Sequence, residues 1–231
     1  MLFRQFIDSD TSTYSYLLAD SASNAAVLID PVKTQANSYL QILEELQLKL
    51  LASIETHTHA DHITAASTVA DITGCDIIQG QEAKAKGITR PVTEGSLIEV
   101  GNYCLKAIYT PGHTDDSYSF YLATKDIRRV FTGDTLLIRG TGRTDFQNGD
   151  PALQYHSLFE KLLKLPDNTT VHPAHDYKGW TVSTIGEERR FNPRLQVKSM
   201  KEYCELMNNL NLPRPKQMDI AVPANLRCGN H

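Results

Sequence analysis

Four short segments with the composition of buried strands each run directly into a histidine or an aspartate, and this pattern limits how the chain can fold. Their residues are mainly apolar or β-branched, as in strands that lie inside a sheet. Because His57, His113, Asp134 and His175 each follow or end such a segment, the pattern predicts that metal-binding side chains gather where strands end. The four segments are "KLLASIE" (49–55), "YCLKAIYT" (103–110), "RRVFTGD" (128–134) and "NTTVHPAH" (168–175).

The densest group of such side chains is "HTHADH", residues 57–62, which holds three of the eight histidines in the sequence. His57 and His59 are two positions apart, so they project to the same side of an extended backbone. Asp61 and His62 follow where the chain is expected to turn into a helix. The spacing therefore offers imidazole nitrogens and a carboxylate to one small volume.

The types of donor narrow the kind of metal. Imidazole and carboxylate together suit Zn, Fe or Mn, and the four cysteines form no CxxC pair of the kind that holds a structural zinc. The later candidates lie in "TPGHTDDS", "FTGDTLL" and "VHPAHD". The donors exceed what one metal needs, so the residues alone also allow a second metal that would generate hydroxide for hydrolysis. The donors available for it are His59, Asp61, His62 and His175.

The remaining periodicity predicts two groups of strands, each followed by helices. Two sheets with helices outside them, in a single domain spanning residues 1–231, account for this order. Helices are expected at 35–48, from about Asp61 to a stop at Gly74, and at 151–165 with Pro151 in the first turn. The other expected strands are 14–20, 25–30, 75–80, 96–100 and 117–123.

Composition excludes several classes of protein. The formal net charge of −4 argues against a nonspecific nucleic-acid binder, which would present a basic face. No apolar run reaches the roughly 20 residues that span a bilayer, so no membrane partner is expected. The first residues lack the pattern of a signal or transit segment, which favours a cytoplasmic protein, or a mitochondrial one if such a segment has been removed. The cysteines read as reduced thiols, with Cys228 expected to be exposed and oxidisable.

The ordered set HxHxDH, His113, Asp134 and His175 resembles the metallo-β-lactamase superfamily over residues 57–175. That resemblance implies an αβ/βα sandwich, in which two sheets pack face to face with helices outside. The scaffold carries many activities, so the fold does not give the function. Longer stretches resemble one family within it, the persulfide dioxygenases. They are "GDTLLIRGTGRTDFQNGD" (133–150), "HPAHDYKGWTVSTIGEERRFNPRL" (172–195) and "NLNLPRPKQMDIAVPANLRCG" (209–229).

The family resemblance implies one Fe(II) per chain, held by the residues that match His57, His113 and Asp134. Two imidazoles and one carboxylate leave coordination positions open for sulfur, oxygen and water. The implied reaction converts glutathione persulfide, O2 and water to glutathione and sulfite, in the detoxification of sulfide and persulfides. The other histidines and the aspartate would then orient the ligands or contact substrate; they are His59, Asp61, His62 and His175.

The same resemblance suggests substrate residues and an assembly. Arginine suits the two carboxylates of glutathione, so Arg143 and Arg194 are candidates, together with Tyr177. Thr141 stands where some family members carry cysteine, so no role of that cysteine carries over. The family is commonly dimeric, which implies a homodimer. The rival interpretation is a glyoxalase II-type hydrolase of glutathione thioesters, which would share HxHxDH and use two metals.

Overall fold

The computed structural model describes residues 1–230, which form two compact units. The first unit contains Met1–Val92, Leu97–Leu105 and the segment from Arg214 onward, and the second contains Thr93–Ser96 and Lys106–Pro213. That the whole of residues 1–231 is one domain stays a prediction, and its last residue, His231, lies outside the described part. Within residues 1–230 every helix is too short or too polar to cross a bilayer.

The sheet of the first unit has six strands in the sequential order β1-β2-β3-β4-β5-β6. The first three pair antiparallel, and β3 to β6 pair parallel. Strands β2 and β3 are buried along their whole length, as expected when both faces of a sheet are covered. The strands are β1 (Leu2–Asp8), β2 (Thr13–Asp20), β3 (Ala25–Ile29), β4 (Lys49–Ile54), β5 (Asp76–Gly80) and β6 (Arg90–Val92).

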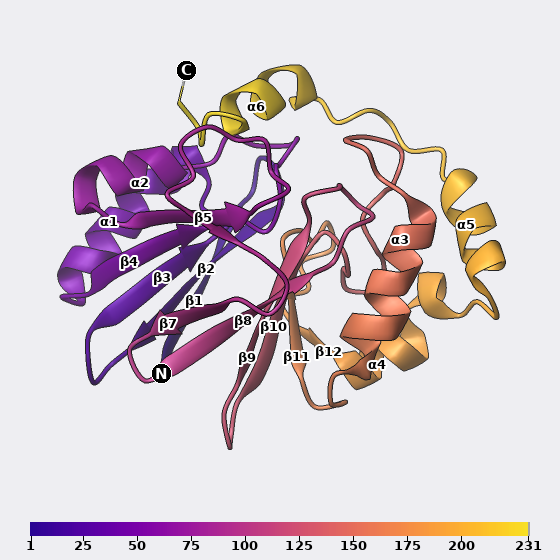
Figure 1. The fold of residues 1–231 in the computed structure, drawn as a ribbon, viewed down its shortest axis with the longest axis horizontal. Helices are drawn as coiled ribbons and strands as arrows, with labels where there is room; N and C mark the ends of the chain where they lie inside the picture. The colour runs from indigo at the N-terminus through magenta and orange to yellow at the C-terminus, as the bar shows by residue number, and fades with distance from the viewer. Residues whose placement is uncertain (231) are drawn as a thin grey trace. The chain divides into compact units, whose positions relative to one another are not determined.

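Two helices cover one face of this sheet, α1 (Ala36–Glu45) after a short 3-10 turn (Lys33–Gln35) and α2 (Ala66–Thr73). Leu17 and Leu28 from the strands pack with Tyr39 of α1 and Val69 of α2 in one buried cluster. A third helix, α6 (Met218–Asn225), joins this unit from the far end of the chain and is yellow in Figure 1. Because β3 and β4 run parallel, their carboxyl ends meet at the same edge of the sheet, and the first candidate ligands follow β4 there.

The second sheet also has six strands, in the order β12-β11-β10-β9-β8-β7. Strands β9 and β10 pair antiparallel, β10 and β11 parallel, and β11 and β12 antiparallel. The parallel pair again brings two strand ends to one edge. The strands are β7 (Leu97–Val100), β8 (Tyr103–Tyr109), β9 (Tyr118–Ala123), β10 (Arg128–Gly133), β11 (Thr170–Pro173) and β12 (Ser183–Thr184).

Helical segments pack against β10 and β11 of the second unit (Figure 1). The Asp150 side chain accepts hydrogen bonds from the amides of Ala152 and Leu153 and so caps the first helix, whose first residue is Pro151. The shared core contains Val130, Leu158, Leu162, Val171, Ile185 and Tyr203, which are buried. The segments are α3 (Pro151–His156), a π-helical turn (Ser157–Lys161), 3-10 turns (Leu162–Lys164, Pro193–Leu195), α4 (Ile185–Phe191) and α5 (Met200–Asn208).

The helix expected over 35–48 is α1 and ends three residues early, at Glu45, while two other predicted helices differ more from the structure. The helix expected from about Asp61 begins only at Ala66, because Thr64 instead bridges to Val32 and donates its amide to Asn225 Oδ1. It ends before Gly74, as predicted. The helix expected over 151–165 changes from α to π to 3-10 geometry along its length. The nine expected strands each correspond to an observed strand, within two residues at each end.

Candidate metal centre

The first group of candidate ligands lies in the loop that follows β4, residues 57–62, here called the histidine loop. Its imidazoles are buried, with His57, His59 and His62 each at most 2% exposed. Neighbouring rings are close, with centroids 4.1 Å apart for His57 and His59 and 4.4 Å apart for His59 and His62. The predicted convergence of these three histidines is therefore confirmed.

Asp30, which follows β3 directly, fixes the base of this loop. Its carboxylate accepts hydrogen bonds from the Thr56 amide at 2.7 Å and the Thr56 hydroxyl at 2.9 Å. Because that hydroxyl already donates to Asp30, it accepts from His57 Nδ1, 3.0 Å away. A hydrogen bond at Nδ1 orients a histidine that ligates a metal through Nε2. Sequence reasoning missed Asp30, although an aspartate that ends an apolar strand is the same signal that marked Asp134.

A buried acid–base group lies beside Asp30. His59 Nε2 donates to Asp30 Oδ1 at 3.1 Å and lies 3.5 Å from Glu55 Oε2. Burial raises the pKa of Glu55 to about 8. Burial by itself lowers the pKa of His59, but the carboxylates of Asp30, Glu55 and Asp61 outweigh it and raise that pKa to about 9. Asp30 thus orients the His59 ring through Nε2 and stabilises its charged form.

The last two residues of the histidine loop form a second contact group. His62 Nδ1 donates to Asp61 Oδ2 at 2.8 Å, and the same carboxylate oxygen accepts from the Thr13 hydroxyl at 3.0 Å. One ligand atom from each of His59, Asp61 and His62 lies within 4.8 Å of the others. This first unit therefore carries a His/Asp group able to hold a metal ion, by distance and by donor type.

The remaining candidates lie in the second unit, where three strand ends supply them. His113 follows β8 and the Pro-Gly turn, Asp134 follows β10, and His175 follows β11. His113 Nε2 lies 3.5 Å from Asp134 Oδ2, and His175 Nδ1 donates to Asp134 Oδ1 at 2.7 Å. His113 Nδ1 donates to the Arg143 carbonyl at 2.7 Å, just as His57 Nδ1 donates to the Thr56 hydroxyl. The structure thus brings together all three predicted residues of this unit.

A close approach of the backbone holds His113 and Asp134 in place. The Gly142 amide donates to the Asp134 carbonyl at 2.6 Å, and a Cβ at Gly142 would lie 2.2 Å from that oxygen and 2.7 Å from His113 Nδ1. The Gly142 carbonyl accepts from Gln154 Nε2 at 3.1 Å, and Gln154 in turn accepts from the Tyr203 hydroxyl at 2.7 Å. Only glycine fits at position 142 without displacing the two candidate ligands.

The three predicted substrate residues differ in their surroundings. The Arg143 guanidinium forms a two-pronged pair with Asp145, at 2.6 and 2.7 Å, and its cation lies 4.5 Å from the Phe146 ring. Arg194 donates to the Thr141 carbonyl and hydroxyl. Tyr177 is 73% exposed, and its ring stacks parallel to that of His175 at 6.1 Å. Tyr177 therefore combines exposure with contact to a candidate site residue.

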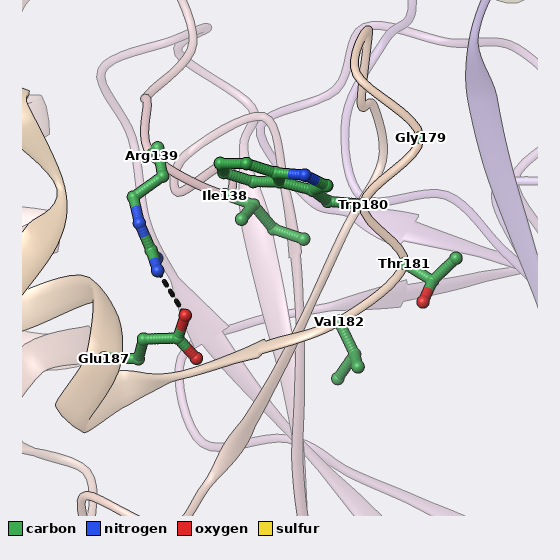
Figure 2. A pocket seen from close by; sticks show the side chains of 7 residues that line it. All are labelled: Ile138, Arg139, Gly179, Trp180, Thr181, Val182 and Glu187. Carbon is green, nitrogen blue, oxygen red and sulfur yellow. Dashed lines mark hydrogen bonds and ion pairs between the residues drawn. The ribbon is translucent and has the colours of Figure 1, made fainter.

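A pocket of about 360 Å³ lies in the second unit (Figure 2). Part of its lining, residues 179–182, follows Tyr177 closely in the sequence. Arg139 pairs there with Glu187 and with the buried Glu188, and its guanidinium carbon lies 5.6 Å from the Trp180 ring centre. Because two carboxylates already pair with Arg139, we assign this guanidinium a structural role and not one in binding a ligand. The lining is Ile138, Arg139, Gly179, Trp180, Thr181, Val182 and Glu187.

The expectation that Cys228 is an exposed thiol is wrong. Its side chain is 2% exposed and packs with Ala66 and Ile77. Burial raises the pKa of this thiol to about 11. The prediction assumed that a cysteine so near the end of the sequence is exposed, but the segment that carries Cys228 packs into the first unit.

Comparison with known proteins gives the class of this fold and site. Residues 9–175 match the family model described as "Metallo-beta-lactamase superfamily". The chain belongs to that superfamily, and the predicted αβ/βα sandwich class is confirmed. At full length it belongs with the persulfide dioxygenases. It is 47% identical to "Persulfide dioxygenase ETHE1, mitochondrial" of Mus musculus over 99% of this chain and 89% of that protein.

A solved structure and a more distant relative complete the comparison. The crystal structure of ETHE1 from Myxococcus xanthus is 50% identical, covers 100% of both chains and superposes with a TM-score of 0.96. A hydroxyacylglutathione hydrolase of Dictyostelium discoideum is 31% identical, over 71% of this chain and 62% of that protein. The relationship to the dioxygenases is thus both closer in sequence and longer than the relationship to this hydrolase.

Proposed function

We propose that this protein is a persulfide dioxygenase that oxidises glutathione persulfide with O2 and water to glutathione and sulfite, in the detoxification of sulfide and persulfides. The reaction is balanced, because oxidation of the outer sulfur to sulfite releases four electrons and O2 accepts four. The observation that carries the proposal is the 47% identity to a persulfide dioxygenase over 99% of the chain. The His/Asp donors described above support it.

We propose His57, His113 and Asp134 as ligands of one Fe(II) per chain. The donor set fits this ion, since two imidazoles and a carboxylate are the ligands of many non-haem iron oxygenases. Both histidines have a hydrogen-bonded Nδ1, with Thr56 and with the Arg143 carbonyl, which suits ligation through Nε2. When bound, Fe(II) would supply open coordination positions for the persulfide sulfur and O2.

The other site residues are proposed to orient these ligands and the substrate. His175 would hold the Asp134 carboxylate through their hydrogen bond. His59, Asp61 and His62 would keep the histidine loop in one conformation through the contacts among them. These four side chains therefore act on position and on proton placement in the proposal.

Arg143, Tyr177 and Arg194 are proposed to bind glutathione. A glutathione carboxylate would compete with Asp145 for the Arg143 guanidinium, because the two-pronged geometry is already used. Tyr177 offers an exposed ring and hydroxyl. A homodimer and a cytoplasmic location complete the proposal, and both rest on the family and on the sequence.

The second candidate function is a glyoxalase II-type hydrolase with two metals. The His59, Asp61 and His62 group favours it, because its donor atoms lie within 4.8 Å of one another and could hold a second ion. The 31% identity to a hydroxyacylglutathione hydrolase points the same way. Metal stoichiometry and the choice of substrate separate the two candidates.

The deciding experiment assays both activities on one preparation. The protein is purified without added metal, iron and zinc per chain are measured, and glutathione persulfide and S-lactoylglutathione are supplied in parallel. The proposal expects close to one iron per chain, oxygen uptake with sulfite formation from the persulfide, and negligible thioester hydrolysis. Thioester hydrolysis without oxygen uptake in an iron-loaded sample would overturn it.

A further inference from the structure

The segment from Gln217 to Gly229, here called the C-terminal brace, packs into the first unit beside the histidine loop. It consists of α6 and the turn that follows (Figure 1). This segment lies within "NLNLPRPKQMDIAVPANLRCG" (209–229), one of the stretches that resemble the persulfide dioxygenases. The proposed reaction assigns it no role. It nevertheless forms hydrogen bonds with residues 59–67, and the bonded residues are 161 to 166 positions apart in the sequence.

Asn225, the last residue of α6, makes three hydrogen bonds to the backbone in and just after the histidine loop. Its side-chain amide donates to the His59 carbonyl at 2.9 Å and to the His62 carbonyl at 2.8 Å. Its side-chain oxygen accepts from the Thr64 amide at 2.9 Å. Asn225 is 4% exposed, so these bonds form away from water. Both donors and the acceptor of this one side chain therefore act on one six-residue stretch.

The loop needs such a partner because it has no regular secondary structure. Residues 55–63 form neither helix nor strand, so their buried carbonyls depend on hydrogen-bond donors from other parts of the chain. An unsatisfied buried carbonyl is costly, and a loop without fixed partners has more conformations to lose. The two Asn225 donors satisfy carbonyls on either side of Asp61 and thereby fix the path of the chain between them.

Other bonds fix the brace itself. The Cys228 carbonyl accepts from the Ser67 amide at 3.0 Å and from the Ser67 hydroxyl at 2.6 Å. Lys33 Nζ donates to the Gly229 carbonyl at 2.7 Å. Gly229 has φ +87°, and a Cβ there would lie 2.1 Å from the Thr64 carbonyl. The brace is thus tied to α2 and to the 3-10 turn before α1 by contacts separate from those that Asn225 makes with the loop.

We propose that Asn225 is a positioning residue for metal binding. It holds the chain from His59 to Thr64, directly after His57, which Thr56 orients from the other side. The inference rests on the proposed function, because it takes His57 as a ligand. Asn225 acts through the loop backbone and touches neither the metal nor the substrate. Removing its side chain leaves the ligands present but lets the loop take other conformations, so affinity falls while the donor set stays complete.

The test compares Asn225→Ala with Ser67→Ala, each purified free of metal and titrated with Co²⁺. Ser67→Ala removes a buried hydrogen bond between the brace and α2 but none to the loop carbonyls, so it controls for general destabilisation. Asn225→Ala is expected to bind Co²⁺ about 10- to 100-fold more weakly than wild type, with altered visible absorption bands of the bound ion. Ser67→Ala should keep both the wild-type affinity and the wild-type bands.

Hydrogen exchange separates failure of this inference from failure of the proposed function. The amides of residues 57–64 are expected to exchange faster in metal-free Asn225→Ala and at the wild-type rate in Ser67→Ala. This result holds whether or not the protein proves to be a dioxygenase, since it uses no substrate and no metal. If Asn225→Ala does not fold, Asn225→Asp replaces it, because aspartate keeps the acceptor for Thr64 and removes the two donors. Wild-type Co²⁺ affinity, bands and loop exchange in the Asn225 variant would overturn the inference.

Discussion

His175 Nδ1 donates to Asp134 Oδ1 at 2.7 Å, while the other carboxylate oxygen of Asp134 lies 3.5 Å from His113 Nε2. One carboxylate therefore faces two imidazoles with its two oxygens. The oxygen that faces His113 is the one suited to a shared ion, and the oxygen bound to His175 is held by a proton. We therefore expect removal of His113 and removal of His175 to have different effects on metal binding.

The proposed ligands should be indispensable. His113→Ala and Asp134→Ala are each expected to lose most of the iron and all measurable oxygen uptake, because a three-ligand site loses geometry and affinity together. The chain should stay folded, as judged by far-UV circular dichroism. Metal analysis after purification checks the prediction. Full iron content with near-normal oxygen uptake in either variant would remove that residue from the ligand set.

His175 should have a graded effect. His175→Ala is expected to retain a complete ligand set but to bind iron about 10- to 100-fold more weakly, as is typical when a residue that orients a ligand is lost. Competition with a chelator of known affinity measures the change. A loss of iron as complete as in Asp134→Ala would show instead that His175 is itself a ligand.

Gly142 should tolerate no side chain. Gly142→Ala places a Cβ 2.2 Å from the Asp134 carbonyl, a backbone atom that cannot rotate away. We expect a loss of about 1 to 3 kcal/mol in the free energy of unfolding, together with reduced metal content. Gly140→Ala is the matched control, since its nearest neighbour would be Leu137 Cβ at 3.8 Å. Similar urea midpoints for the two variants would contradict the prediction.

His172 should make stability fall in acid. Burial, and next the charge of Arg129, lower the pKa of His172 to about 3, whereas an unfolded histidine titrates near 6.5. The unfolded chain therefore binds the extra proton below about pH 6.5, so this stability is fully present above that pH and is lost as the pH falls. Between pH 7 and pH 5 the contribution is about 2 kcal/mol.

The measurement is urea unfolding at both pH values for the wild type and for His172→Gln. The variant is expected to lose less free energy of unfolding between pH 7 and pH 5 than the wild type does. An equal loss in the two proteins would assign the acid sensitivity to other groups.

Cys228 should be unreactive in the native protein. Its burial and its raised pKa leave little thiolate at neutral pH, and the thiolate is the reactive form. Timed alkylation followed by mass spectrometry should label Cys104 and Cys204, which are partly exposed, before Cys228. In urea all four cysteines should react at similar rates. Early labelling of Cys228 in the native chain would contradict the buried position.

The sequence predicted the site residues best where a strand and a turn determine the local path. Asp134 and His175 follow β10 and β11, a parallel pair, so an apolar run followed by a polar residue was enough to place them at one edge. His113 was found the same way, because Pro-Gly marks the turn after β8. Local signals also located the strands and the stop of α2 at Gly74.

Partners that are distant in sequence could not be predicted. Asn225 gives no local sign that it binds the carbonyls of His59 and His62, since a helix-end asparagine is ordinarily a cap. The start of α2 was misplaced for the same reason, because the Thr64 amide has its partner on α6. The two-pronged contact between Arg143 and Asp145 needed side-chain geometry, since spacing alone does not tell a structural ion pair from a substrate-binding arginine.

The contact between Asn225 and the histidine loop also sets an order of events during synthesis. The loop leaves the ribosome more than 160 residues before the side chain that satisfies its carbonyls. Strands β1 to β6 are complete long before that point, so the nascent sheet carries the histidine loop with its Asp30 contacts but without those of Asn225. On the role proposed for Asn225, the loop would reach its metal-binding conformation only once the C-terminal segment has arrived, and an ion captured earlier would meet a loop that can still rearrange.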